Sequence, residues 1–157
     1  LTVHEGRPAE AQASLREAAA QFHELKASDD ESAALAALAR ALLADKKTQE
    51  ADQTIQQALR LAEKSRNRLS IFEVGLNAAR VEAASGKRAA AITRLQKLLR
   101  DADGYVGVEL EAGLTLGEIE IASGQVVQGR ARLDSVGQQA RAKGFLLTAN
   151  QAAAAKG

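Results

Sequence analysis

Apolar residues recur along the chain at the spacing of one helix face, and the same positions return at regular intervals. Ala51, Ile55 and Ala58 stand at i, i+4 and i+7, which places them on one side of a helix. The set recurs once before this stretch and twice after it, the last time in a weakened form. The offsets between copies, about 38–40 positions, are typical of two-helix solenoid repeats. The other three stripes are Ala11, Leu15 and Ala18; Ala91, Leu95 and Leu98; and Gly129, Leu133 and Val136.

A second stripe lies roughly one helix length ahead of each of the last three copies. Its later two copies end in an Ala-Ser-Gly turn, at Gly86 and Gly124. A glycine just past the last helical residue is the usual left-handed stop of a helix. The pattern therefore predicts a helix, a tight turn and a second helix in each repeat. The stripe consists of Leu35, Leu38, Ala39 and Leu42; Gly75, Ala78, Ala79 and Glu82; and Gly113, Leu116, Gly117 and Glu120.

Turn and capping residues set the expected helix bounds. Ser28 with Glu31, and Ser70 with Glu73, have the capping-box spacing, and Thr48 is a candidate cap for the helix after it. All connections are short, so consecutive helices should pack antiparallel as hairpins. The predicted fold class is all-α, a solenoid of about eight helices. The expected helices cover residues 8–27, 31–44, 49–66, 70–85, 87–102, 106–123, 125–143 and 145–155.

These helices predict a single repeat domain over residues 1–157. Its repeats span about 31–66, 70–102 and 106–143. Helix 8–27 is then the second helix of a partial repeat, and 145–155 is a C-terminal capping helix. An amphipathic hairpin cannot bury its apolar face alone, so the repeats are expected to stack on one another. Since the chain starts abruptly and without Met, we expect it to be a domain excised from a longer chain.

The paired stripes resemble the tetratricopeptide repeat (TPR). The positions that carry the resemblance are Leu35, Leu38, Ala39, Leu42, Ala51, Ile55 and Ala58, and more loosely Gly113, Leu116, Gly117, Glu120, Gly129, Leu133 and Val136. The signature aromatics and the closing Pro of the family are absent, and the period of about 38–40 exceeds the family's 34. The chain, over about residues 8–143, is thus similar to the longer, divergent TPR-like class of bacterial regulators, often appended to transcription-factor or kinase domains. The resemblance implies a right-handed superhelix.

In the TPR family the first helix of each hairpin lines a concave groove. Projecting that face places Arg40, Arg80 and Glu118 at equivalent positions of successive repeats. The planar fork of Arg bonds anions bidentately, so the resemblance implies binding of a peptide or a neighbouring domain. The alternative is that these charges form ordinary surface ion pairs, worth about 0–1 kcal/mol each. The candidate groove residues are Arg40, Leu43, Glu73, Leu76, Asn77, Arg80, Leu114, Glu118 and Ile121.

Composition and charge narrow the range of functions. A net charge of +1 argues against strong attraction to nucleic acid or to an anionic membrane. The chain has no Cys, which excludes disulfides and thiolate zinc sites and fits a reducing, cytoplasmic location. Neither His4 nor His23 has a second metal ligand at helical spacing, and no Ser stands beside an activating His. We therefore expect no enzyme, no metal and no cofactor.

Three functions remain open at this point. The first is a non-catalytic interaction or regulatory module that binds a protein, a peptide or an adjacent domain of the parent chain. The second is a structural or oligomerisation spacer that self-associates through its terminal helices, with Phe145, Leu146 and Leu147 docked on another copy. The third is a small-molecule sensor with an apolar pocket lined by Leu and Ile.

Overall fold

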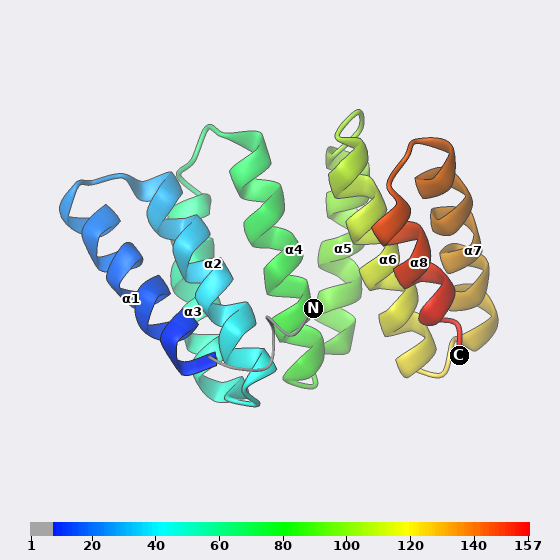
Figure 1. Ribbon diagram of the computed structural model, residues 1–157, viewed down its shortest axis with the longest axis horizontal. Coiled ribbons are helices and arrows are strands. Elements are labelled where there is room, and N and C mark those ends of the chain that lie inside the picture. Colours follow the sequence, from blue (N-terminus) through cyan, green and yellow to red (C-terminus); the bar gives the residue numbers. More distant parts are fainter. Residues whose placement is uncertain (1–7) are drawn as a thin grey trace. The chain divides into compact units, whose positions relative to one another are not determined.

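The computed structural model describes residues 8–157, which form helices joined by short turns, with no strand among them (Figure 1). Successive helices begin at residues 8, 28, 48, 68, 88, 106, 126 and 146, so the starts are evenly spaced apart from one slightly shorter step. The predicted all-α repeat of about eight helices is confirmed, whereas the handedness of the superhelix stays a prediction. The helices are α1 (Pro8–Glu24), α2 (Ser28–Ala44), α3 (Thr48–Ala62), α4 (Arg68–Ala84), α5 (Arg88–Asp101), α6 (Val106–Ala122), α7 (Val126–Ala142) and α8 (Leu146–Ala154).

Six of the seven turns between the described helices contain a single residue in the left-handed region, and the α3–α4 turn contains none. Gly86 and Gly124 have φ of +82° and +87°, which confirms both Ala-Ser-Gly stops. Lys26 and Lys46 take the same conformation in the first two turns, with φ of +57° and +59°. A side chain in this region costs roughly 1–2 kcal/mol, so these two turns are formed against a local preference.

This turn leaves no room for the side-chain caps that the sequence suggested for α2 and α3. Helix α2 begins at Ser28 itself and α3 at Thr48, so Ala27 and Lys47 occupy the cap positions and neither side chain caps the helix. The predicted capping by Ser28 and Thr48 is therefore wrong. The residue that would have capped each helix already belongs to its first turn.

Helix α4 is capped by a residue that the capping-box pattern missed. The Asn67 side chain accepts hydrogen bonds from the backbone nitrogens of Leu69 and Ser70, at 3.1 and 3.3 Å. The predicted cap, Ser70, lies inside the helix, where its buried Oγ has no partner among residues 8–157. Asn67 takes the role because its carbonyl oxygen reaches the second and third amides of the helix.

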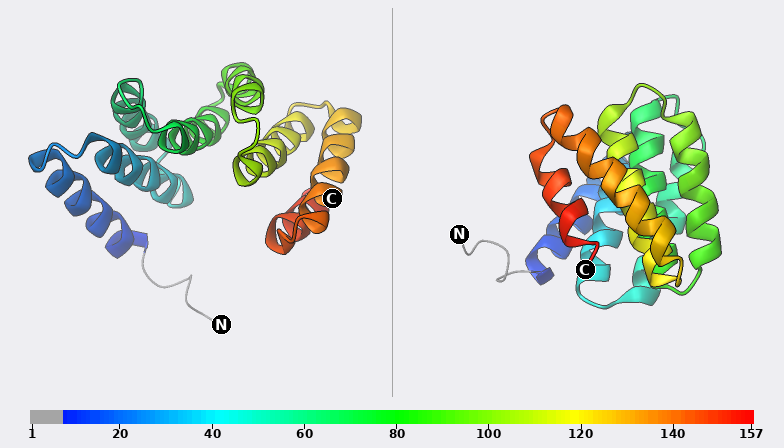
Figure 2. Two further views of the ribbon diagram at one scale, coloured as in Figure 1. Left: turned by 90° about the horizontal axis from the view of Figure 1, so that it is seen from above. Right: turned by 90° about the vertical axis from the view of Figure 1, so that its right-hand side faces the viewer.

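Contacts between helices divide the chain into two compact units, residues 1–87 and 88–157. In the first unit, α3 packs against both α2 and α4, and α1 packs against α2. In the second unit, α7 lies beside both α6 and α8, and α5 packs against α6 (Figure 2). The predicted repeat 70–102 is divided between the units, since α4 belongs to the first and α5 to the second.

Small side chains dominate the core of the first unit. The predicted stripe of Ala51, Ile55 and Ala58 is fully buried, and it meets Ala39 and Leu42 of α2 in one cluster. An alanine buries little apolar area, so each contact contributes little unless the helix axes lie close together. The first unit is therefore stable only if the axes of its helices lie close together.

Helices α6 and α7 approach each other across glycines. A Cβ atom on Gly113 would lie 2.8 Å from Val136, and one on Gly117 would lie 2.8 Å from Leu133. A Cβ atom on Gly129 would lie 2.7 Å from the carbonyl oxygen of Gly117. A side chain can rotate away but a backbone carbonyl cannot, so Gly129 is the position with least room for any other residue.

Replacing Gly129 with alanine should destabilise the protein by about 1–3 kcal/mol, because the backbones of α6 and α7 must move apart. The measurement is urea denaturation followed by circular dichroism. Gly137→Ala is the matched control, since it lies on the same helix and its Cβ would make an ordinary 3.7 Å contact with Ala152 of α8. The control should be neutral or stabilised by up to about 1 kcal/mol through helix propensity. Equal effects of the two changes would contradict this account of the interface.

Candidate functional site

The predicted groove residues fall into two sets, one in each compact unit. The first set lies on α2 and α4, which pack directly against each other and run in the same direction (Figure 1). Arg40 is exposed on α2, and its side chain makes no hydrogen bond or ion pair with residues 8–157. Leu43, on the same helix, is half-buried against the core of the first unit. This stretch of α2 therefore presents an accessible cation close in sequence to a partly exposed apolar side chain.

The residues predicted on α4 are held by their own helix. The Asn77 side chain donates a hydrogen bond to the Glu73 carbonyl oxygen at 3.0 Å and accepts one from Arg80 at 3.5 Å. Leu76 is buried, with 8% of its surface exposed. Glu73 is exposed and Arg80 is half-buried. The polar groups of α4 are thus positioned by neighbouring groups, whereas Leu76 serves mainly as core.

The second set lies on α6. Leu114 is 5% exposed and belongs to the core of the second unit. Ile121 is half-buried and lies beside Gly129 of α7. Glu118 is the exposed member of the set. Leu76 and Leu114 were expected as apolar contacts for a ligand, and the structure places both inside the units. What the candidate residues offer at the surface is chiefly polar, from Arg40, Glu73 and Glu118.

A charge pair in the second unit, between a buried carboxylate and a half-buried guanidinium, was missed by the sequence analysis. The Glu120 side chain is 1% exposed, and both of its oxygens accept hydrogen bonds from Arg132 of α7 at 2.9 Å. Gln128 donates a third hydrogen bond at 3.0 Å. The signal was present, because Glu120 aligns with the apolar Leu42 in the repeat and such a position faces the interior.

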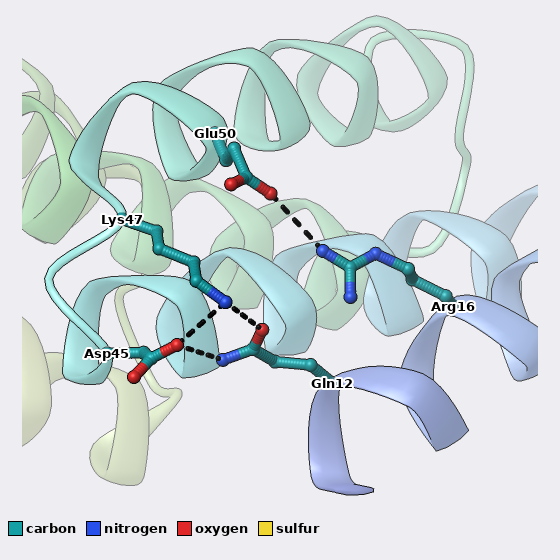
Figure 3. A network of polar contacts seen from close by, with 5 residues as sticks. All are labelled: Gln12, Arg16, Asp45, Lys47 and Glu50. Atoms are coloured by element: carbon teal, nitrogen blue, oxygen red, sulfur yellow. Dashed lines mark hydrogen bonds and ion pairs between the residues drawn. The ribbon is translucent and has the colours of Figure 1, made fainter. Parts of the chain in front are cut away.

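The densest polar cluster of the first unit joins α1 to the α2–α3 turn (Figure 3). Gln12, only 1% exposed, donates to Asp45 and accepts from Lys47, both at 3.2 Å. Lys47 also pairs with Asp45 at 2.8 Å, and Arg16 reaches Glu50 of α3 at 3.3 Å. Hydrogen bonds from Lys47 and Gln12, together with the Lys47 charge, lower the pKa of Asp45 below its usual 3.8. The partners of Asp45 are occupied with one another, so the cluster fastens α1 and offers no vacant reactive group.

Residues 8–157 contain no group of three or more His, Asp or Glu side chains placed to hold a metal ion. The His23 ring nitrogen lies 3.0 Å from Glu31 and forms an exposed contact between α1 and α2. His4 lies outside the described residues. None of the described helices is both long enough and apolar enough to cross a bilayer.

No protein-family model, curated protein or solved structure matches this chain. The resemblance to the TPR family therefore rests on residue positions and stays a prediction.

Arg132→Met should destabilise the protein by about 3 kcal/mol, because it leaves the buried Glu120 carboxylate without its counter-charge. Adding Glu120→Leu should restore most of this loss, since Leu42 already fills the aligned position in α2 with no exposure. Chemical denaturation of the single and double variants measures both effects. Arg130→Met is the control, because Arg130 is exposed and bonds only a terminal carbonyl group, that of Lys156. A double variant no more stable than Arg132→Met would exclude the uncompensated charge as the cause.

The Asp45 cluster should make part of the stability dependent on pH. Because the pKa of Asp45 is lowered in the folded state, its contribution is present above the unfolded value of 3.8 and is lost as the pH falls through the folded value. The difference in urea midpoint between wild type and Asp45→Asn should therefore be largest near neutral pH and should shrink in acid. Asp103→Asn, which removes an exposed carboxylate outside this cluster, is the matched control. A constant difference between wild type and Asp45→Asn at every pH would exclude a role for the Asp45 charge.

Proposed function

We propose that this chain is a non-catalytic, TPR-like interaction module that serves a regulatory or scaffolding role in a larger, bacterial-type protein. Its partner is a peptide or an adjacent domain that carries an exposed carboxylate or phosphate. The absence of Cys suits a reducing compartment, and we place the module in the cytoplasm.

The observation that carries the proposal is that the exposed Arg40 side chain makes no hydrogen bond or ion pair with residues 8–157. Some cations at the surface pair with a carboxylate, as Arg16 and Lys87 do with Glu50 and Asp52. Arg40 has no such partner among residues 8–157, although its helix is packed between neighbours and therefore fixed in position. An unpaired guanidinium on a fixed helix loses little freedom of its backbone when it binds an anion bidentately.

Arg40 supports this role better than the other predicted cation does. Arg80 is half-buried and bonds Asn77, so changing it would disturb α4 as well as any ligand. Arg40 can be altered without removing a polar contact to residues 8–157. Arg40 is therefore the position at which a substitution can weaken binding without disturbing the fold.

A structural or oligomerisation spacer is the second candidate, and it is favoured by a different observation. Phe145, Leu146 and Leu147 at the start of α8 are 40%, 65% and 73% exposed. Three adjacent exposed apolar residues form a larger patch than the singly scattered apolar side chains that a monomeric surface ordinarily shows.

Charge reversal at Arg40 tests the interaction module directly. Wild type, Arg40→Glu and Arg60→Glu are used as baits in a lysate of the source organism, and the affinity of a retained protein is then measured by calorimetry. Arg60 is an exposed cation of α3 and provides the matched control. Arg40→Glu should weaken binding on the order of ten-fold or more, because a charge-assisted pair is lost and a repulsive pair replaces it. Equal retention by all three baits, or retention of nothing by the wild type, would refute the Arg40 proposal.

A further inference from the structure

Helix α1 carries the same apolar stripe as α3 and α7, but the stripe is not fully covered. Aligned at the first residue of each helix, the stripes are Ala11, Leu15, Ala18 and Phe22 in α1; Ala51, Ile55, Ala58 and Ala62 in α3; and Gly129, Leu133, Val136 and Ala140 in α7. All members are buried in α3 and α7. In α1, Ala11 is exposed, and Leu15, Ala18 and Phe22 are only half-buried. The described residues thus leave one side of α1 open.

The α6–α7 pair shows what covers such a stripe. The stripe of α7 lies against the preceding helix, where Gly113 of α6 faces Val136. Val106, the first residue of α6, packs on the cluster that contains Ala140. In this pair the covering helix α6 therefore presents Gly113 midway along its length and Val106 at its start.

Helix α8 presents this covering face with no helix against it. Aligned at the first residues, Ala153 of α8 falls on Gly113 of α6, and Leu146 falls on Val106. Both residues of α8 are exposed, Leu146 by 65% of its surface. The buried residues of α8 are instead Thr148, Ala149 and Ala152, on the side that packs against α7 and α6. Among the helices of residues 8–157, α8 is thus a covering helix whose stripe-bearing partner is missing.

We infer that α8 of one copy packs against α1 of a second copy in the antiparallel manner of α6 against α7. The alignment also gives the register of this contact. Ala153 lies opposite Ala18, as Gly113 lies opposite Val136, and Leu146 lies opposite Phe22. Small residues meet midway and large apolar residues meet at the end, so the two faces are complementary in size. Because α8 has nine residues, it covers the half of α1 that holds Ala18 and Phe22.

This contact is heterologous, since the two copies contribute different surfaces. Each copy offers one α1 face and one α8 face, so the contacts either close into a ring of copies or continue into a longer assembly. The contact does not involve Arg40, so it stands independently of the proposed interaction module.

Sedimentation velocity of the wild type over a wide concentration range tests the inference. The average mass should rise above that of the monomer as the concentration increases. Ala153→Glu and Ala18→Glu should each remain monomeric, because a charge buried in an apolar contact is strongly unfavourable. The matched controls are Gln151→Glu in α8 and Ala20→Glu in α1. Both are exposed, and the residues aligned with them, Glu73 of α4 and Arg60 of α3, stay exposed although their helices have neighbours.

Mixing the two interface variants distinguishes this contact from the alternatives. Ala153→Glu keeps an intact α1 face and Ala18→Glu keeps an intact α8 face, so an equimolar mixture should form a dimer that does not grow. If α8 packed on α8, Ala18→Glu alone would still associate; if α1 packed on α1, Ala153→Glu alone would do so. Circular dichroism of both variants checks that their helix content is unchanged. Either of those results, or a wild type that stays monomeric at every concentration, would overturn the inference.

Discussion

The structure depends on helices that approach one another across alanine and glycine. The contacts at Gly113, Gly117 and Gly129 leave no space for a Cβ atom, and in the first unit alanines surround Leu42 and Ile55. Small residues bury little apolar area each, so the free energy of folding must come from many short contacts along helices of similar length. This condition accounts for the regular spacing of helix starts, because each helix must lie against its neighbours over most of its length.

That regular spacing is the part of the fold that the sequence predicts well. Stripes such as Ala51, Ile55 and Ala58 identify the buried side of each second helix, and Gly86 and Gly124 mark the stops. The caps were predicted less well. A capping box is recognised from residue types. Whether a serine caps a helix, however, depends on the residue at which the preceding turn ends and the helix begins. A three-residue turn, 25–27, places Ser28 inside the helix itself, which a local pattern cannot reveal.

The candidate site was harder to predict for a related reason. A helix that packs against neighbours on several sides is apolar around much of its circumference, so projecting one face does not separate core from surface. In α6, the buried residues include Leu110, Leu114, Leu116 and Ile119, which point in different directions. Leu114 was therefore assigned to a groove although it lies in the core. Charged residues such as Arg40 were easier, since an unpaired guanidinium is rarely buried.

Interfaces made of small residues also need a means of fixing their register. Sliding one alanine stripe along another by a helical turn replaces small residues with small residues, so apolar contact alone distinguishes the two arrangements weakly. Directional polar groups do not tolerate such a shift. Moving α1 by one turn would separate the buried Gln12 amide from Asp45 and Lys47, at a cost of about 1–3 kcal/mol for the buried amide left unpaired. The Glu120–Arg132 pair constrains α6 against α7 in the same way. The buried polar residues Gln12 and Glu120 thus lie where apolar packing specifies the register least.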